Sequence, residues 1–264
     1  MTIITKKIKS FLKKKRDFKV SFIICGTQKG GTTALDYYLR KHTEICMANK
    51  KEVHFFDVDK LFKNNKINYI KYHKNFDPKI KHKVIGEATP IYMYWNNSIK
   101  RIYNYNPEMK LIMILRNPIT RAYSHWNMEF EKQKEKDSFF KAVQKECSTK
   151  NKNTYRQNRV SSYLERGLYS KQINKILKYF DRDQLMIIRS KSLMHNPQKT
   201  LDEIANFLQI TPFKNVKPKK IHSGAYTKKM TQDEELFLYN YFEEEIDNLE
   251  NILDWNLADW KNDS

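Results

Sequence analysis

Short apolar runs alternate with longer amphipathic segments along most of this chain. A run of consecutive apolar residues predicts a strand that is covered on both faces, as in a parallel sheet. The predicted strands are Val20–Cys25, Ile45–Ala48, Val84–Gly86, Leu111–Leu115 and Leu185–Ile188. Apolar residues that return every three or four positions predict helices. The predicted helices are Thr33–Arg40, Thr120–Glu131, Ser138–Lys145, Lys171–Tyr179, Pro197–Phe207 and Asp233–Leu249.

The order of these elements indicates the fold class. Strands and helices alternate, which predicts an α/β protein with a central parallel sheet and helices on both faces, a three-layer fold. The chain of 264 residues is long enough for a full hydrophobic core, and α/β folds of this size are often single domains. We expect one domain over residues 20–264, preceded by a basic segment at residues 1–19.

A glycine loop follows the first predicted strand. Gly26, Gly30 and Gly31 lie between that strand and a helix that begins at Thr32 or Thr33. The first N–H groups of a helix lack internal partners, so a strand, a glycine loop and a helix N-terminus together form a cradle for phosphate or sulfate. The fold is therefore expected to be P-loop-like.

The position of the lysine argues against ATP as the ligand of this loop. The Walker pattern places lysine and then serine or threonine after the last glycine. In this chain Thr32 and Thr33 follow Gly31, and the lysine, Lys29, lies inside the loop. The spacing favours an anion that is bound differently from the phosphates of ATP.

A second group of polar residues follows the strand Leu111–Leu115. Arg116 comes at its carboxyl end, and Asn117 and Pro118 are suited to begin the next helix. Ligands of open α/β sheets bind beyond the carboxyl ends of the strands, so Arg116 is expected at the same edge as the glycine loop. Arginine suits a bidentate phosphate contact, and Ser124 could add a hydroxyl; a solvated surface arginine and serine are the alternative.

Together these segments resemble the sulfotransferases that use 3′-phosphoadenosine 5′-phosphosulfate (PAPS). The residues that match the family's 5′-phosphosulfate loop are Thr27, Gln28, Lys29, Gly30, Gly31, Thr32 and Thr33. Arg116 and Ser124 match the pair that holds the 3′-phosphate in that family. The resemblance extends over residues 20–260 and implies sulfuryl transfer from PAPS, with Lys29 stabilising the charge that grows on the bridging oxygen.

The resemblance implies further donor contacts toward the C-terminus. Tyr169 lies in a segment that resembles the one that contacts the nucleotide in the family, although it could equally be a core aromatic residue. Lys219 and Lys220 lie in a segment that looks like the basic loop that closes over the donor phosphates. A solvated basic loop is the alternative interpretation of these two lysines.

A third motif resembles the branch of the family that sulfates carbohydrates such as heparan sulfate. It reads Lys51-Glu52-Val53-His54-Phe55-Phe56-Asp57, and in that branch the glutamate is the proposed base. Glu52 is thus the candidate base and His54 its rival, because a histidine titrates near working pH. A surface glutamate paired with a neighbouring lysine is the alternative.

The acceptor contacts follow from the same resemblance. Lys51, Asp57 and Glu87 are candidate acceptor-binding residues; Asp57 is expected either to orient His54 or to cap the next helix, and Glu87 to hold either the acceptor or Lys29. Some carbohydrate-sulfating members carry lysine where this chain has Ala88. The resemblance therefore implies a carbohydrate or glycolipid hydroxyl as acceptor without naming it.

Composition limits the partners and the compartment. The net charge is +20, which attracts polyanions such as PAPS, an anionic glycan or an anionic membrane. The first twenty residues hold eight Lys/Arg and one acid, with Ile4, Ile8, Phe11 and Leu12 at helical spacing. This pattern predicts either a membrane-surface helix or a solvated tail. No zinc-finger, RNA-binding or basic-zipper pattern occurs, so a nucleic acid partner is not expected.

The three cysteines, Cys25, Cys46 and Cys147, are scattered and form no C-x-x-C pair. This spacing predicts neither a disulfide framework nor a zinc site and fits a reducing cytoplasm. No apolar stretch has the length of a membrane span. We therefore expect a metal-independent, cytoplasmic enzyme with possible peripheral membrane contact. A P-loop nucleotide kinase and a non-catalytic protein that binds polyanions or membranes remain as alternatives.

Overall fold

A five-stranded parallel sheet forms the centre of the protein. The computed structural model describes residues 18–63, 66–150, 157–219 and 228–261. The strands are β1 Phe22–Gly26, β2 Ile45–Met47, β3 Val84–Ala88, β4 Lys110–Leu115 and β5 Leu185–Arg189. Their order across the sheet is β2-β3-β1-β4-β5. All five predicted strands are confirmed, with ends that shift by two residues or fewer.

The central position of β1 explains its composition. It pairs with β3 on one side, where Ile24 lies opposite Ala88, and with β4 on the other, where Ile24 lies opposite Ile112. All five of its residues are buried. A continuous apolar run is therefore what this strand requires, because both of its edges are paired and both of its faces are covered.

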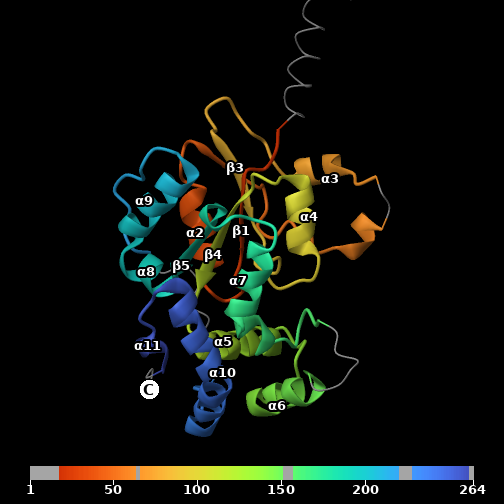
Figure 1. Ribbon diagram of the computed structural model, residues 1–264, viewed down its shortest axis with the longest axis vertical. Helices are drawn as coiled ribbons and strands as arrows, with labels where there is room; N and C mark the ends of the chain where they lie inside the picture. Colours follow the sequence, from red (N-terminus) through yellow and green to blue (C-terminus); the bar gives the residue numbers. More distant parts are fainter. Residues whose placement is uncertain (1–17, 64–65, 151–156, 220–227, 262–264) are drawn as a thin grey trace, which may run out of the picture.

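Helices cover both faces of the sheet (Figure 1). The helices are α2 Thr32–Leu39, α3 Tyr69–His73, α4 Ser98–Tyr105, α5 Pro118–Glu131, α6 Phe139–Lys150, α7 Tyr169–Leu177, α8 Ser190–His195, α9 Pro197–Leu208, α10 Gln232–Leu253 and α11 Ala258–Lys261. The six predicted helices are among them. The sequence analysis did not predict α3, α4, α8 and α11. Of these, α3, α8 and α11 have six residues or fewer and carry little periodic signal. In contrast, α4 is amphipathic, with Ile99, Ile102 and Tyr105 on its buried face.

Alternate residues of β1 enter two separate cores. Phe22 and Ile24 pack in a core with Leu35 of α2 and Ile204 of α9. Ile23 and Cys25 point to the other face, into a larger core that α4, α5, α7 and α10 cover. This alternation follows from the pleat of a strand and gives the three-layer α/β fold that the sequence predicts.

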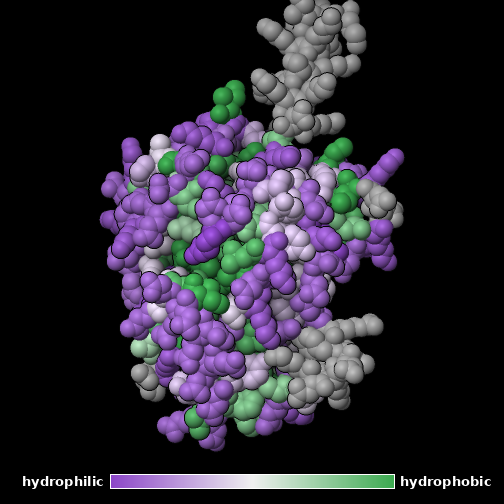
Figure 2. Space-filling model, in the orientation of Figure 1, coloured by the Kyte–Doolittle hydropathy of each residue, from purple (hydrophilic) through white to green (hydrophobic). Residues whose placement is uncertain are grey.

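The carboxyl ends of the strands share one edge of the sheet. The glycine loop follows β1, the Lys51–Asp57 segment comes shortly after β2, Arg116 follows β4, and α8 follows β5. Figure 2 shows that the face of the molecule in this view is mostly hydrophilic, with hydrophobic atoms gathered near its middle, where Figure 1 draws α2 and β4. The glycine loop, the Lys51–Asp57 segment and Arg116 therefore lie at the edge where open α/β sheets bind ligands.

Candidate active site

The glycine loop is tightly held between β1 and α2. The N–H of Thr27 donates to the carbonyl of Ile114 at 3.1 Å, and the N–H of Gly30 donates to the carbonyl of Thr27 at 3.0 Å. A Cβ on Gly30 would lie 2.5 Å from the Ile114 carbonyl oxygen, so only glycine fits there. The loop backbone is therefore fixed by its neighbour β4 before any ligand binds.

The N-terminus of α2 is left open by its capping residue. Gly31 is the N-cap, has φ of 110°, and offers no side chain to cap the helix. The first N–H groups of a helix have no internal partner, so an uncapped first turn at Thr32 and Thr33 is suited to an anion. Lys29, also in the left-handed region at φ of 66°, adds positive charge to the same loop.

Arg116 is held by side chains on two sides. Its Nε donates to Oγ1 of Thr120 at 3.0 Å, while the hydroxyl of Tyr169 donates to the Arg116 carbonyl at 2.8 Å. Tyr169 is fully buried, which favours support of Arg116 over contact with a nucleotide base. Ser124 lies two turns into α5 and is 5% exposed. Asn117 caps α5 by accepting from the N–H of Ile119, as the sequence predicts.

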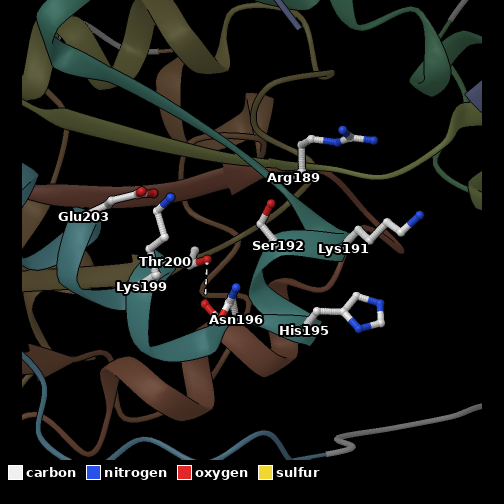
Figure 3. Close-up of a pocket in the computed structure, with 8 residues that line it drawn as sticks. All are labelled: Arg189, Lys191, Ser192, His195, Asn196, Lys199, Thr200 and Glu203. Carbon is white, nitrogen blue, oxygen red and sulfur yellow. Dashed lines mark hydrogen bonds between the residues drawn. The ribbon is translucent and has the colours of Figure 1, made fainter. Parts of the chain in front are cut away.

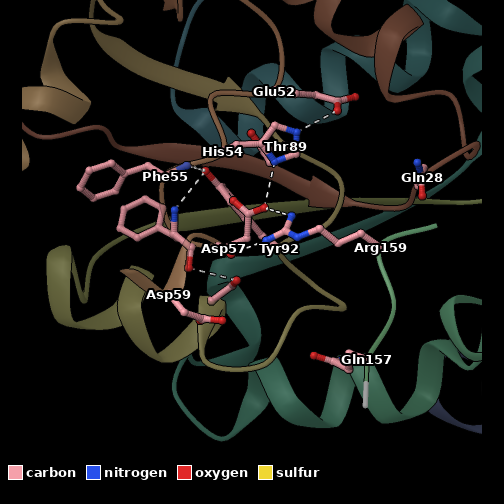
Figure 4. Close-up of polar contacts among 12 residues, drawn as sticks. Gln28, Glu52, His54, Phe55, Asp57, Asp59, Thr89, Tyr92, Gln157 and Arg159 are labelled. Carbon is pink, nitrogen blue, oxygen red and sulfur yellow. Dashed lines mark hydrogen bonds and ion pairs between the residues drawn. The ribbon is translucent and has the colours of Figure 1, made fainter. Parts of the chain in front are cut away.

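Glu52, His54 and Asp57 form one cluster (Figure 4). Nδ1 of His54 lies 2.9 Å from Oδ2 of Asp57, and its Nε2 lies 3.3 Å from Oε2 of Glu52. Lys51 donates from Nζ to Oε1 of Glu52 at 2.8 Å. An imidazole can donate from both ring nitrogens only when it is protonated, so two carboxylate partners favour the cationic form of His54.

The charges of the cluster shift the pKa values in opposite directions. Hydrogen bonds to Asp57 and then Glu52 raise the pKa of His54 to about 9. The hydrogen bond from His54 lowers the pKa of Glu52 to about 2, against the effect of burial. Burial opposes ionisation of Asp57, but the hydrogen bonds from His54 and Arg159 outweigh it and lower its pKa. At neutral pH the cluster therefore contains two carboxylates and an imidazolium.

The backbone around the cluster is strained. Glu52 and His54 have φ of 61° and 54°, in the left-handed region that non-glycine residues rarely adopt. The N–H of Glu52 donates to the carbonyl of Ala88 at 2.9 Å, which ties the segment to the end of β3. Such strain costs of order 1–3 kcal/mol per residue and concentrates at functional sites.

Glu87 lies near the carboxyl end of β3 and has no exposed surface. Its carboxylate accepts from the hydroxyls of Tyr72 at 2.7 Å, Thr89 at 2.6 Å and Tyr92 at 3.3 Å. Burial raises its pKa to about 7. The hydroxyl of Tyr92 also accepts from the N–H of Phe55 at 2.9 Å. This placement favours a structural role for Glu87, as the support of the Phe55 segment, over contact with an acceptor.

Two arginines that the sequence did not single out connect the regions of the site. Arg159 donates from Nη1 to Oδ2 of Asp57 at 2.5 Å (Figure 4). Arg166 donates from Nη1 to the side-chain oxygen of Gln28 in the glycine loop. A signal was present for Arg166, which falls in the segment that resembles the family's nucleotide-contacting region. Arg159 stands before that segment, and nothing local distinguishes it from other basic residues.

Lys219 contacts the helix that follows the glycine loop. Its N–H donates to the hydroxyl of Tyr38 at 3.0 Å, and its Nζ donates to the hydroxyl of Tyr37 at 3.1 Å. Both tyrosines belong to α2, so Lys219 lies beside the helix whose N-terminus forms the cradle. Lys220 and residues 1–17 lie outside the described residues.

A pocket of about 500 Å³ lies at the carboxyl end of β5 (Figure 3). Its lining is mostly polar and basic: Arg189, Lys191, Ser192, His195, Asn196, Lys199, Thr200 and Glu203. Ser190, at the start of α8, brings this region close to the glycine loop, because a Cβ on Gly31 would lie 3.3 Å from the Ser190 hydroxyl.

The described residues contain neither a metal-binding cluster nor a membrane-spanning helix. Within the described ranges no cluster of three or more His, Cys, Asp or Glu side chains could hold a metal ion. Among the same residues no helix is both long and apolar enough to cross a membrane. The expected metal independence of the enzyme stays a prediction.

Comparison with known proteins decides the family. A family model described as the sulfotransferase domain matches residues 19–262. The chain belongs to the sulfotransferase family. This sulfotransferase domain is 25% identical to the membrane-associated sulfotransferase kil1 of Dictyostelium discoideum over 92% of this chain and 66% of the relative. It is 30% identical to heparan sulfate glucosamine 3-O-sulfotransferase 5 of Mus musculus over 72% of this chain.

The chain spans only part of these relatives, 66% of the first and 53% of the second. Among solved structures, a sulfotransferase from Alicyclobacillus acidocaldarius superposes with a TM-score of 0.78 at 24% identity, covering 93% of this chain and 100% of that one. This likeness establishes the fold. The resemblance read from the glycine loop and the Arg116 segment is confirmed at the level of the family.

Proposed function

We propose that this sulfotransferase moves the sulfuryl group of PAPS to a hydroxyl of a carbohydrate or glycolipid acceptor, by in-line transfer with Glu52 as the base. The observation that carries the proposal is the connection of the two regions. A cluster with an ionised glutamate is tied through Arg159 and Arg166 to a glycine loop with an open helix N-terminus. Donor cradle and proton acceptor thus belong to one site.

The residues of the donor region fit a nucleotide with two anionic ends. Lys29, Thr32 and Thr33, with the open first turn of α2, would hold the phosphosulfate end and stabilise charge on the leaving phosphate. Arg116 and Ser124 would hold the 3′-phosphate, since the guanidinium is fixed at Nε and its terminal nitrogens make no hydrogen bond to any described residue. Thr27, Gln28, Gly30 and Gly31 shape the loop.

Glu52 is the better base of the two candidates. A protonated His54 has no lone pair to accept a proton, and its pKa of about 9 keeps it protonated at neutral pH. Glu52 is ionised there, although its low pKa makes it a weak base until His54 moves or the acceptor displaces Lys51. His54 would then orient Glu52, and Asp57 would orient His54.

The relatives support the acceptor class. Several of them are named as heparan sulfate glucosamine 3-O-sulfotransferases, enzymes with a carbohydrate acceptor. Lys51, beside Glu52 and partly exposed, is suited to contact an acceptor. We also propose a cytoplasmic enzyme without a nucleic acid partner, whose basic residues 1–19 contact anionic membranes. One relative is named as membrane-associated.

The test uses the full chain with adenosine 3′,5′-bisphosphate, ATP and labelled PAPS. We expect the bisphosphate to bind far more tightly than ATP in isothermal titration. Sulfate transfer to a glycan and glycolipid panel should persist in excess chelator, because the Walker lysine–hydroxyl pair that serves a magnesium-bound nucleotide is not matched after Gly31. Preference for ATP would indicate a nucleotide kinase, and binding without turnover would indicate a non-catalytic protein. Loss of activity that added metal restores would contradict metal-independent transfer.

A further inference from the structure

One short segment touches both regions of the site. Residues 157–166 follow a stretch outside the described residues and lead through the 3₁₀ turn η2, Glu165–Gly167, into α7. At one end of the segment Arg159 contacts Asp57 of the base cluster. At the other end Arg166 contacts Gln28 of the glycine loop. The residues of each contact are more than a hundred positions apart in the chain, so only the fold brings them together.

Arg159 makes two hydrogen bonds to Asp57. Its Nη1 donates to the carboxylate oxygen Oδ2 at 2.5 Å, and its Nη2 donates to the Asp57 main-chain carbonyl. The guanidinium also stacks on the ring of Trp95 at 4.2 Å. Asp57 is fully buried and shares the same Oδ2 with His54. Arg159 therefore fixes both the side chain and the backbone of the residue that orients His54.

Arg166 fixes the loop that carries Arg159. It is 3% exposed and stacks on Tyr94 at 4.8 Å. Its Nη2 donates to the carbonyl of Arg159 at 2.9 Å, and its Nε donates to the hydroxyl of Ser162 at 2.8 Å. Its Nη1 reaches Gln28. One buried guanidinium thus ties the Arg159 loop to the donor loop.

We propose that Arg159 and Arg166 are positioning residues for sulfuryl transfer. Arg159 fixes the position of Asp57 and, through it, the orientation of His54 and Glu52. Arg166 fixes the distance between that cluster and the glycine loop. This inference rests on the proposed function. In-line transfer requires the base and the donor at a set separation, and a displacement of about 1 Å can reduce the rate by up to roughly 10²-fold.

The chain offers a matched control in Arg101. It also donates to the 56–59 segment, through Nη1 to the carbonyl of Phe56 at 2.9 Å and through Nη2 to Oδ1 of Asp59 at 2.7 Å. It also lies over an aromatic ring, that of Phe62, at 4.5 Å. None of these contacts reaches the base cluster or the glycine loop. If the role of Arg159 were only to anchor the 56–59 segment, the loss of Arg101 should lower turnover as much as the loss of Arg159.

The first experiment compares Arg159→Gln, Arg159→Lys and Arg101→Gln with the wild type. The turnover number at saturating PAPS and the dissociation constant of adenosine 3′,5′-bisphosphate are measured for each. We expect Arg159→Gln to lower turnover by roughly 10- to 100-fold with bisphosphate affinity unchanged. The turnover number of Arg159→Lys should lie between those of Arg159→Gln and the wild type, since an ammonium keeps the charge but cannot reproduce both hydrogen bonds of the guanidinium. Arg101→Gln should retain turnover.

The second experiment is a double-mutant cycle of Arg159→Gln with Asp57→Asn. If Arg159 acts through Asp57, the double variant should be no slower than Asp57→Asn alone. Additive losses would overturn the proposal, as would full turnover in Arg159→Gln. If Arg159→Gln does not fold, the intermediate turnover of Arg159→Lys decides, and wild-type turnover in that variant would overturn the proposal.

Arg166→Lys should change both measurements, because Arg166 contacts Gln28 as well as the Arg159 loop. We expect weaker bisphosphate binding together with slower turnover. A loss confined to thermal stability, with both measurements normal, would overturn the role of Arg166. Absence of PAPS turnover in the wild type is a different outcome, which rejects the proposed function itself.

Discussion

The donor region and the base region of this site rely on different groups: mainly backbone atoms in the donor loop, and charged side chains in the base region. The phosphosulfate end of the donor region is one continuous stretch, residues 27–33, whose backbone is held by β4 and leads through the N-cap Gly31 into the open first turn of α2. The base region consists of side chains, in which Glu52, His54 and Asp57 are held by one another and by Arg159. The loop depends on backbone conformation, whereas the base region depends on contacts between charged side chains.

This difference suggests that the two halves can be damaged separately. A backbone cradle keeps its N–H groups when a distant side chain changes, whereas each member of a charged cluster alters the pKa of the next. Substitutions in the base region should therefore reduce turnover and leave donor affinity intact. Substitutions at Arg116 and Ser124, the proposed 3′-phosphate contacts, should weaken donor binding and leave the turnover number at saturating PAPS intact.

The largest expected effect is that of Glu52→Gln. The substitution keeps the size of the side chain and removes the proton acceptor, so the turnover number should fall by roughly 10²–10⁴-fold. The affinity for adenosine 3′,5′-bisphosphate should stay unchanged in isothermal titration. Glu44→Gln is the matched control, because Glu44 precedes β2 at the opposite edge of the sheet and pairs with Lys83. Near-full turnover in Glu52→Gln, with its loss in His54→Ala, would reverse the two roles.

An intermediate effect is expected from Arg116→Ala, on the other side of the comparison. A lost charge-assisted hydrogen bond of about 1.5–3 kcal/mol should weaken bisphosphate binding by roughly 10- to 150-fold. Ser124→Ala should weaken it less. Binding of adenosine 5′-phosphosulfate, which lacks the 3′-phosphate, should hardly change.

The control for Arg116 is Arg182→Ala, since Arg182 donates to the carbonyl of Leu185 near the amino end of β5. Equal weakening of both nucleotides by Arg116→Ala would contradict its assignment to the 3′-phosphate.

The smallest effect concerns the titration of His54. We expect its imidazole to titrate near pH 9 by NMR, and at lower pH in Asp57→Asn and Glu52→Gln, because those carboxylates raise its pKa. The folded pKa lies above the ordinary value of about 6.5. The resulting stabilisation is therefore complete below about pH 6.5 and is lost as the pH rises through about 9.

The free energy of unfolding, measured at pH 6.5 and pH 10, should fall slightly more for the wild type than for His54→Gln. The effect is small because the His54 side chain is 42% exposed and its ion pairs are screened by solvent. An imidazole that titrates at its ordinary pH would show that the cluster does not form in solution.

Much of the fold and the donor region could be predicted because their signals are local. The five apolar runs marked the strands, and Gly26 to Thr33 marked the loop, since each depends on consecutive residues. Short helices such as α8 carried too few turns to show a period. The motif around Glu52 contained all three members of the cluster, but only the structure showed that His54 contacts both Glu52 and Asp57.

The sequence by itself determined which chemistry is present: a phosphate-type loop with a displaced lysine, an arginine at a strand end and a glutamate beside a histidine. The tertiary structure decided what each group is able to do. Packing buried Glu87 and gave its carboxylate three hydroxyl donors. It also placed the hydroxyl of Tyr169 against the carbonyl of Arg116. Arg159 contacts Asp57 although the two residues are 102 positions apart in the chain. Burial and long-range contact set the charge and the partners of a side chain, and neither is encoded in any single stretch of residues.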